Sequence, residues 1–278
     1  MWCLRSLFPV LTLTLFLAFL VPLLASAAKN KKFVDCSPTS FRCGQDVTRS
    51  NAVKISYPFR RTGMPNYCGH PGFEVRCVNK DNYTLPAIDI AGKAHLLGDI
   101  LYAKRYFALE NIDYVSDTCP QTFTNTTIDP TLFEYHSRTV NLTLYFNCPP
   151  LTLSSSFHNV PCLSSNIEGY QSYYSLPKNY SLPNDNPPPL ELVEKCSSII
   201  MIPIYTGFAD LLLKDRIDFL YALQDGFLLN WTIGKGWCDG CQDSGGVCGF
   251  DPSSPNSPTC FCPDATTNGT CKASRSMC

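Results

Sequence analysis

Apolar and polar residues alternate with a period of two along several stretches of this chain, which is the pattern of half-buried β-strands. In the clearest case Val140, Leu142, Leu144 and Phe146 alternate with polar or aromatic neighbours. One face of this strand should be buried, and Asn141 on the other face should point to solvent. Shorter runs of the same kind predict strands at 54–59, 73–78, 105–114 and 227–232. The chain is therefore expected to be mainly β.

One segment has the 3.6-residue period of an amphipathic helix, and Gly226 beyond it is a natural C-terminal stop. Upstream, the Pro- and Asn-rich stretch Asn179 to Pro189 has no periodicity and is expected to be a surface loop. Cys162 and Cys196 flank this loop and could join its ends by a disulfide. The positions that predict the single helix are Leu212, Arg216, Phe219, Leu220 and Leu223.

The N-terminus has the composition of a secretory signal peptide. An apolar run from Leu7 to Leu24 precedes the small residues Ala25 to Ala28, where a signal peptidase could cut. A retained membrane anchor is the alternative, because the apolar run is nearly long enough to span a bilayer. Later apolar stretches are shorter or broken by charges, so residues 1–28 are predicted to be a signal and the rest to be secreted.

Six cysteines near the C-terminus, in a segment bounded at 236–272, have the spacing of an epidermal-growth-factor-like knot. Such a small fold needs disulfides for stability, which agrees with an oxidising extracellular setting. A zinc site is the alternative for closely spaced cysteines, but the secretory context favours disulfides. The six cysteines are Cys238, Cys241, Cys248, Cys260, Cys262 and Cys271.

The chain also contains six Asn-x-Ser/Thr sequons, which predict a secreted glycoprotein. Asn268 lies inside the knot and is the site most readily expected to be buried or unused. The sequons are at Asn82, Asn125, Asn141, Asn179, Asn230 and Asn268.

The net charge of -1 conceals a split along the chain. Residues 29–118 contain 13 Lys or Arg against 9 Asp or Glu, whereas residues 119–278 contain 8 against 14. A basic first part suits an anionic partner, and outside the cell that means acidic polysaccharide or a membrane surface rather than nucleic acid. Ordinary scatter among solvated side chains is the alternative.

No constellation in the sequence predicts catalysis. Asp243-Ser244-Gly245-Gly246 is similar to the nucleophile loop of trypsin-like proteases, but Gln242 replaces the preceding glycine and no histidine stands in the matching context. Nor does any carboxylate pair identify a glycoside hydrolase: Glu191 and Glu194 are ordinary surface candidates. We expect neither enzymatic activity nor a metal or other cofactor.

Several motifs resemble the extracellular region of plant wall-associated and leaf-rust-resistance-type receptor-like kinases. The first half carries Phe41-Arg42-Cys43-Gly44, Ile55-Ser56-Tyr57-Pro58-Phe59 and Tyr67-Cys68-Gly69-His70-Pro71-Gly72-Phe73, followed by Cys77. The second half carries Gly226-Phe227-Leu228-Leu229-Asn230-Trp231 and the cysteines from Cys238 to Cys248. The resemblance implies a galacturonan-binding module over 29–155 and a C-terminal wall-associated-kinase module over 156–278.

The resemblance also implies non-catalytic binding of pectic polysaccharide in the apoplast or cell wall. Cations would pair with uronic carboxylates, and aromatic faces would pack on sugar rings. Tyr57 and Phe59 could instead belong to the core, because they alternate with Ile55 in an expected strand. The candidate polysaccharide-binding residues are Lys54, Tyr57, Phe59, Arg60, Arg61, Tyr67 and Arg76.

The family's knot implies the pairs Cys238–Cys248, Cys241–Cys260 and Cys262–Cys271. With Cys3 removed in the signal, Cys278 is expected to be unpaired and available for a disulfide-linked dimer. Most relatives continue into a membrane span and a kinase, whereas this sequence stops at Cys278 without kinase motifs. The alternative expectation is therefore a receptor fragment or soluble decoy that engages a protein or glycan ligand in defence signalling.

Overall fold

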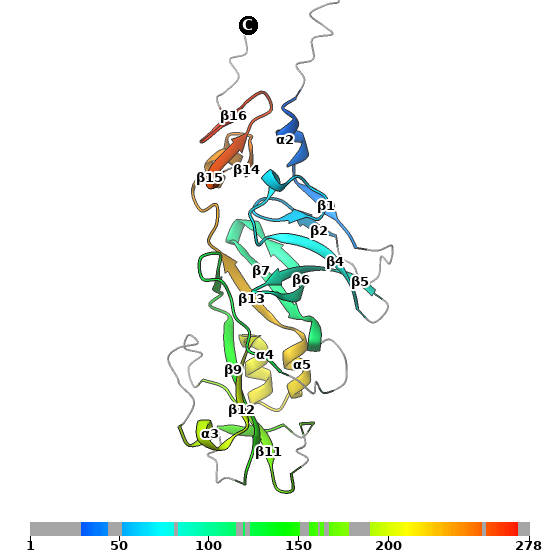
Figure 1. Cartoon of the computed structure of the whole chain (residues 1–278), viewed down its shortest axis with the longest axis vertical. Coiled ribbons are helices and arrows are strands. Elements are labelled where there is room, and N and C mark those ends of the chain that lie inside the picture. The colour runs from blue at the N-terminus through cyan, green and yellow to red at the C-terminus, as the bar shows by residue number, and fades with distance from the viewer. Residues whose placement is uncertain are drawn as a thin grey trace, which may run out of the picture.

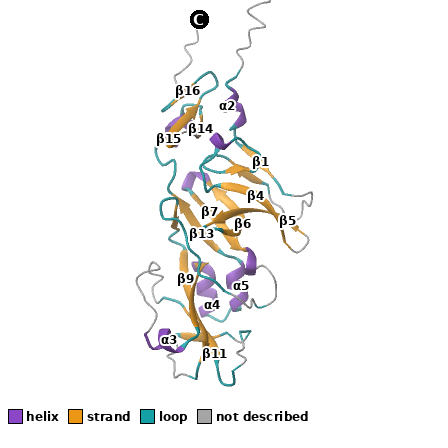
Figure 2. Cartoon of the chain, in the orientation of Figure 1, coloured by secondary structure: helices purple, strands orange, loops and turns teal. Residues whose placement is uncertain are grey.

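The computed structural model describes residues 29–43, 52–80, 83–114, 119, 123–150, 156–160, 162–163, 167–177, 190–251 and 254–271. The signal segment, the loop 179–189, the sequons at Asn82 and Asn179, and Cys278 lie outside these residues. Strands dominate the described chain (Figure 2). The expected fold class, a mainly β protein rich in disulfides, is confirmed.

Both the first and the last described segments lie at one end of the long axis of the molecule, and the green and yellow segments from the middle of the chain lie at the other end (Figure 1). The central layer is a seven-stranded sheet with the spatial order β3 (Arg60–Arg61), β4 (Glu74–Lys80), β5 (Tyr83–Ile90), β6 (Lys93–Leu101), β7 (Tyr106–Asn111), β13 (Phe227–Trp231) and β8 (Phe133–Tyr135). β3 is parallel to β4, and the other neighbours are antiparallel. A short ribbon of β1 (Thr39–Phe41) and β2 (Val53–Ile55) accompanies this sheet.

The inner face of the seven-stranded sheet carries the main core. β7 alternates buried and half-buried residues along its whole length, as its sequence predicts. Phe59 is at the centre of an aromatic cluster, with its ring centroid 5.2 Å from that of Phe73, 5.3 Å from that of Phe107 and 5.4 Å from that of Trp231. These edge-to-face contacts are the favourable geometry for aromatic pairs. The expected strand at 54–59 is shorter in the structure, because β2 ends at Ile55 and the chain turns at Tyr57 and Pro58.

A second, four-stranded sheet has the order β10 (Phe157–Asn159), β11 (Gln171–Ser175), β9 (Thr139–Cys148) and β12 (Ser198–Tyr205). Val140, Leu142 and Leu144 on β9 are buried, as the alternation predicts. Asn141 does not point freely to solvent as expected: it is half-buried and its Oδ1 is enclosed. β9 is an inner strand flanked by β11 and β12, and Asn141 lies opposite Pro203 of β12.

The division of the chain at residue 155 stays a prediction. β13 inserts between β7 and β8 of the central sheet, although it comes from the second half of the sequence. Likewise β9, from the first half, forms the centre of the four-stranded sheet with strands of the second half. The two halves of the sequence are therefore interleaved in space rather than separated.

Two helices replace the single helix expected over 212–223. α4 (Thr206–Leu213) ends before Asp215, whose φ of 51° is left-handed and interrupts helical geometry. α5 (Phe219–Gln224) starts afresh at Asp218, whose side chain accepts a hydrogen bond of 2.8 Å from the Tyr221 N–H. The apolar period continues across the break because both helices pack on the same core. The remaining helical elements are α2 (Lys31–Asp35), α3 (Leu190–Lys195), α6 (Trp237–Asp243) and the 3-10 turns η1 (Asn66–Cys68), η2 (Tyr102–Lys104) and η3 (Ile112–Tyr114).

The C-terminal knot consists of α6 and a three-stranded sheet of β14 (Val247–Asp251), β15 (Ser254–Phe261) and β16 (Thr266–Thr267). Its disulfides join Cys238 to Cys248, Cys241 to Cys260 and Cys262 to Cys271, which are the pairs that the family resemblance implied. Their sulfurs are already bonded to each other, so these cysteines offer no free thiolate to zinc.

Four further disulfides lie outside the knot. Cys36–Cys68 and Cys43–Cys77 secure the first segment to the central sheet. Cys119–Cys162 and Cys148–Cys196 secure the second sheet. The expected Cys162–Cys196 bond is therefore wrong, because each of these cysteines pairs with a partner at the end of a different segment.

Candidate functional site

The aromatic residues of the family motifs are not at the surface. Phe59 is fully buried, and Tyr57 is buried against the cysteines of the knot and the edge of the Trp237 ring, 5.4 Å away between centroids. Neither ring presents a face to a polymer in the folded protein. Their assignment as polysaccharide contacts is corrected: they hold the core and the knot together.

Tyr67 also has a structural contact. Its hydroxyl donates a hydrogen bond of 2.5 Å to Asp35 Oδ2, and its ring meets the edge of Phe261 in the knot. Lys32 covers the ring, with Nζ 5.3 Å from the centroid. Burial and the Asp35 carboxylate together raise the pKa of Tyr67 to about 12. This half-buried tyrosine has its hydroxyl and one ring face already engaged.

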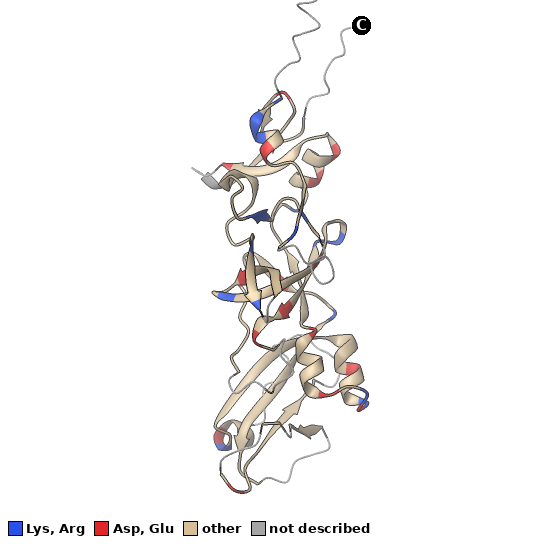
Figure 3. Cartoon of the chain, turned by 90° about the vertical axis from the view of Figure 1, so that its right-hand side faces the viewer, with Lys and Arg blue, Asp and Glu red and all other residues tan. Residues whose placement is uncertain are grey.

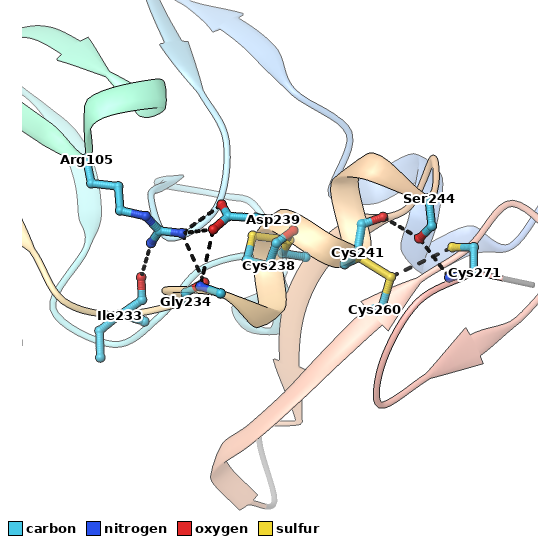
Figure 4. The surroundings of a disulfide bond; sticks show 11 residues. Arg105, Ile233, Gly234, Cys238, Asp239, Cys241, Ser244, Cys260 and Cys271 are labelled. Atoms are coloured by element: carbon cyan, nitrogen blue, oxygen red, sulfur yellow. Dashed lines mark hydrogen bonds and ion pairs between the residues drawn. A yellow bond between two sulfur atoms is a disulfide. The ribbon is translucent and has the colours of Figure 1, made fainter.

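One arginine links the knot to the central sheet by several hydrogen bonds (Figure 4). Arg105, which has a left-handed φ of 56°, donates to both carboxylate oxygens of Asp239 at 2.7 and 2.8 Å. The same guanidinium donates to the carbonyl oxygens of Ile233 and Gly234 at 3.2 Å each. An arginine fork suits this arrangement, because one planar group supplies several donors in fixed directions.

The loop that resembles a protease nucleophile is a structural turn of the knot. Ser244 Oγ donates to the Cys241 carbonyl oxygen and accepts from the Cys271 N–H, both at 2.8 Å. Gly246 is required by packing, because a Cβ there would lie 2.5 Å from the Cys260 sulfur. The serine therefore ties two ends of the knot, as the cysteine spacing predicts.

Two candidate arginines lie on the outer face of the central sheet, each beside a carboxylate. Arg60 is ion-paired with Glu74, and Glu74 also accepts a hydrogen bond of 3.0 Å from the Thr62 hydroxyl. Arg76 binds both oxygens of Asp89, at 2.7 and 3.2 Å, and this contact raises the pKa of the guanidinium.

Strand register explains the pairing. Arg60 lies opposite Glu74 across β3 and β4, and Arg76 of β4 lies diagonal to Asp89 of β5. Gly69 allows this arrangement, because a Cβ there would lie 2.6 Å from the Arg60 Cβ. The glycine of the Cys-Gly motif therefore allows the chain to pass close to β3.

Arg61 and Lys54 differ from the other candidates. Among the described residues, neither forms an ion pair; Arg61 makes one long hydrogen bond of 3.4 Å to the Thr62 carbonyl oxygen. Arg61 lies at the sheet edge next to Arg60, whereas Lys54 lies on β2, in a different surface region described below. Arg61 lies opposite Val75 of β4, so its side chain leaves the edge strand β3 on the other side from that of Arg60. We define the arginine face as Arg60 and Arg76 with their partners Glu74 and Asp89, together with Arg61 at the adjoining sheet edge.

The charge split along the sequence does not become two oppositely charged halves. Figure 3 shows blue and red segments intermingled through the molecule. The ion pairs Lys31–Asp35, Arg60–Glu74 and Arg76–Asp89 all fall within the segment that has excess positive charge. These three pairs leave the excess positive charge of the segment unchanged, but they engage three of its cations and so reduce the number that is free to meet a ligand.

A groove of about 620 Å³ lies beside the same sheet and was not predicted. The ladder between β5 and β6 ends at Ala87–Leu96, although both strands continue. Pro86 has no N–H to extend that ladder, and the pairing of β6 with β7 shifts register between Leu97 and Ile100. The proline inside an otherwise regular strand pattern is the sequence signal for this opening.

The groove is acidic. Among the described residues Lys54 is its one basic lining residue, against the carboxylates of Asp99, Glu110 and Asp225. Burial and the neighbouring Asp225 charge raise the pKa of Glu110, and burial raises the pKa of Asp225. Lys54 is therefore an unsuitable galacturonan contact, since a polyuronate at this place would meet three like charges.

The described sequons differ in accessibility. Asn268 is exposed, contrary to the expectation for a residue inside the knot, because it lies in the turn after β16. Asn125 is exposed, and its Oδ1 accepts a hydrogen bond of 2.7 Å from the Met201 N–H. Asn230 on β13 is half-buried, like Asn141.

Two family models match the chain. The one described as wall-associated receptor kinase galacturonan-binding matches residues 36–119, and the one described as wall-associated receptor kinase C-terminal matches residues 161–265. The chain thus carries two modules that are described for wall-associated receptor kinases. Neither matched model is a kinase domain.

Similar proteins occur in Arabidopsis thaliana. Leaf rust 10 disease-resistance locus receptor-like protein kinase-like 1.2 is 26% identical over 254 residues, which is 90% of this chain and 36% of the relative. Receptor-like protein kinase-like 2.5 of the same series is 29% identical over 86% of this chain and 35% of the relative. A putative RING-H2 finger protein, ATL21B, is 25% identical over 90% of this chain and 60% of the relative.

The chain thus spans about a third of the length of the kinase relatives. No solved structure matches it. Within the residues that the structure describes, none of the helices is long and apolar enough to cross a membrane.

Proposed function

We propose that this protein binds galacturonan, the acidic polymer of pectin, without chemical conversion, and that it does so through the arginine face. The observation that carries the proposal is the gathering of Arg60, Arg61 and Arg76 at one edge of one sheet, within the segment that matches the galacturonan-binding model. Guanidinium groups suit planar carboxylates, because two parallel N–H donors meet two oxygens.

The existing partners of these arginines leave donors for a ligand. Arg76 uses Nε and one terminal nitrogen for Asp89, and its side chain is 40% exposed. Arg61 has no carboxylate partner among the described residues and is the strongest candidate for direct contact. Arg60 is 82% buried by its surroundings (18% exposed) and mainly positions Glu74 and the edge strand.

The polymer would then compete with Glu74 and Asp89 for the guanidinium groups. Such exchange of one exposed ion pair for another has a small net free energy, so single contacts should contribute little and repeated contacts along the polymer should add up. This favours long, unesterified stretches over short oligosaccharides.

The test is binding of the secreted protein to immobilised polygalacturonate. Affinity should fall as NaCl rises, because exposed charges are screened over about 10 Å at 0.1 M. Methyl-esterified pectin should bind less well, since it lacks the carboxylate charge. Replacing Arg61 and Arg76 together by Ala should weaken binding by about tenfold, which corresponds to about 1.4 kcal/mol.

Lys235→Ala is the matched control, because Lys235 is an exposed cation near the knot and far along the chain from the arginine face. It should leave affinity unchanged. Equal affinity for free and esterified polymer, or affinity that does not change with salt, would refute a cation-driven site.

A second candidate function is supported by the printed names of the relatives, most of which are receptor-like protein kinases. In that case the chain acts as the ectodomain, or as a decoy of one, and engages a protein or glycan in defence signalling. Sequencing the transcript beyond the codon for Cys278 separates the two, since a receptor requires a membrane span and a kinase further on.

An extracellular or cell-wall location follows from either function, and secretion after removal of residues 1–28 is part of the proposal. Fractionation of plant tissue that expresses the protein should place it in the wall fluid, with a new N-terminus near Lys29. Retention in the membrane fraction with an intact Met1 would favour the anchor instead.

A further inference from the structure

The groove lies where β5 and β6 stop pairing and where the pairing of β6 with β7 shifts register. β5 and β6 stop pairing at Ala87–Leu96, and β2 closes the far side with Ala52, Val53 and Lys54. Small residues form part of the lining: a Cβ on Gly98 would lie only 3.1 Å from the Ala108 Cβ. An extended chain fits next to unpaired strand segments, because its backbone can continue their hydrogen bonding.

The negative charge of the groove indicates that its ligand is positively charged. Asp99, Glu110 and Asp225 contribute three carboxylates, and among the described residues none of them lies in an ion pair. This is the opposite of the arginine face, where Glu74 and Asp89 are each paired with an arginine. Carboxylates that form no ion pair and lie next to apolar surface attract a positively charged ligand.

A second, smaller cavity of about 200 Å³ continues the groove. It shares Glu110 and Asp225 with the groove and adds Gln224 and Tyr221 of α5. Tyr221 is 49% exposed, so its side chain is accessible to a ligand. A lysine or arginine head between two carboxylates and a tyrosine face gains both ion pairing and cation–π attraction.

We propose that this groove binds an extended basic peptide segment of a partner protein. The long aliphatic stems of Lys or Arg would lie over Leu96, Pro86 and Ala108, and their charged heads would reach Glu110 and Asp225. Polygalacturonate is a poor occupant, because its carboxylates would face those of the groove. The groove shares no residue with the arginine face, so peptide binding can be tested separately from galacturonan binding.

The test is fluorescence anisotropy with the whole secreted protein and a labelled peptide of alternating lysine and valine. Saturable binding that weakens with salt is expected. The double variant Glu110→Gln with Asp225→Asn should reduce affinity by about tenfold. Lys54→Glu replaces the one cation in the described lining by a carboxylate and should increase affinity.

Asp243→Asn is the matched control, because Asp243 is an exposed carboxylate on α6, outside the groove. It should leave the affinity unchanged. Absence of saturable binding, or equal loss with Asp243→Asn, would overturn the proposal. A neutral β-glucan oligosaccharide that binds in place of the peptide and loses affinity in the double variant would also overturn it, and would make the groove a sugar site.

Unchanged polygalacturonate binding by the double variant would confirm that the two surfaces are separate. Weaker polygalacturonate binding by that variant would contradict the assignment of the groove to a cationic ligand.

Discussion

Residues of the same family motifs lie on both faces of the seven-stranded sheet, but they pack in the core on the inner face and form ion pairs on the outer face. On the inner face, Phe59 and Phe73 pack edge to face and are fully buried. On the outer face, Arg60 and Arg76 pair with carboxylates at the surface. Neighbouring residues of a strand point to opposite faces of the sheet. Two residues of the same motif can therefore have different roles. Changes on the inner face should alter stability, and changes on the outer face should alter binding.

The largest effect should come from Phe59→Ala on the inner face. The substitution leaves a cavity among four aromatic rings and should lower the free energy of unfolding by about 3–5 kcal/mol. Urea denaturation of the disulfide-intact protein measures this. Arg76→Ala, on the outer face, is the control and should change stability by less than about 0.5 kcal/mol. A similar loss in both variants would remove the distinction between the faces.

His95 makes the stability of the inner face depend on pH. It is 1% exposed, and neither ring nitrogen has a hydrogen-bond partner among the described residues. Burial, with a smaller contribution from Lys93, lowers the pKa of His95 to about 4, against the opposing effect of Asp113 and Asp89.

Because the folded pKa of His95 lies below its unfolded value of about 6.5, the unfolded chain binds the proton more tightly. Stability from this group should be complete above about pH 6.5 and fall by about 3 kcal/mol as the pH drops to about 4. Urea midpoints from pH 7 to pH 4 measure the loss. His95→Leu should remove this part of the slope; an unchanged slope would mean that other groups cause it.

The junction between the sheet and the knot should give an intermediate effect. Arg105→Ala removes four hydrogen bonds to Asp239, Ile233 and Gly234 and should cost about 1–2 kcal/mol. Hydrogen exchange of the α6 amides should accelerate before that of β7. Arg105→Lys should recover only part of the loss, since an ammonium cannot reach all of these acceptors at once. Uniform acceleration across the molecule would contradict a local role.

The smallest effect on stability should come from the outer face. Arg76→Ala breaks an ion pair whose two side chains are 40% and 52% exposed, so the free energy of unfolding should change by less than about 0.5 kcal/mol. The thermal midpoint measures this. A loss as large as that of Arg105→Ala would mean that the pair holds the sheet together rather than serving a ligand.

Local patterns in the sequence predicted much of the fold. The alternation along β9 and the cysteine spacing of the knot are properties of adjacent residues, and both appear in the structure. The break between α4 and α5 was missed, because the apolar period continues across Asp215 while the backbone does not. The pairing of Cys148 with Cys196 depends on which strands meet and is not encoded locally.

The candidate site was harder to predict for the same reason. Alternation suggested that Phe59 could be core, but only the packed structure shows four rings around it. The groove joins Glu110 to Asp225, which are distant in the sequence and meet because β13 follows α5 into the central sheet. Charge counts along the chain could not reveal that the basic residues are paired and these acidic ones are not.

The central claim is that the outer-face arginines, rather than the motif aromatics, bind the acidic polymer. Asp89→Asn tests it most directly, because it removes the carboxylate that occupies Arg76 and leaves the guanidinium in place. In isothermal titration with polygalacturonate at low salt, this variant should bind a few times more tightly than the parent protein, whereas Arg76→Ala should bind more weakly. Unchanged affinity in both variants would contradict the claim.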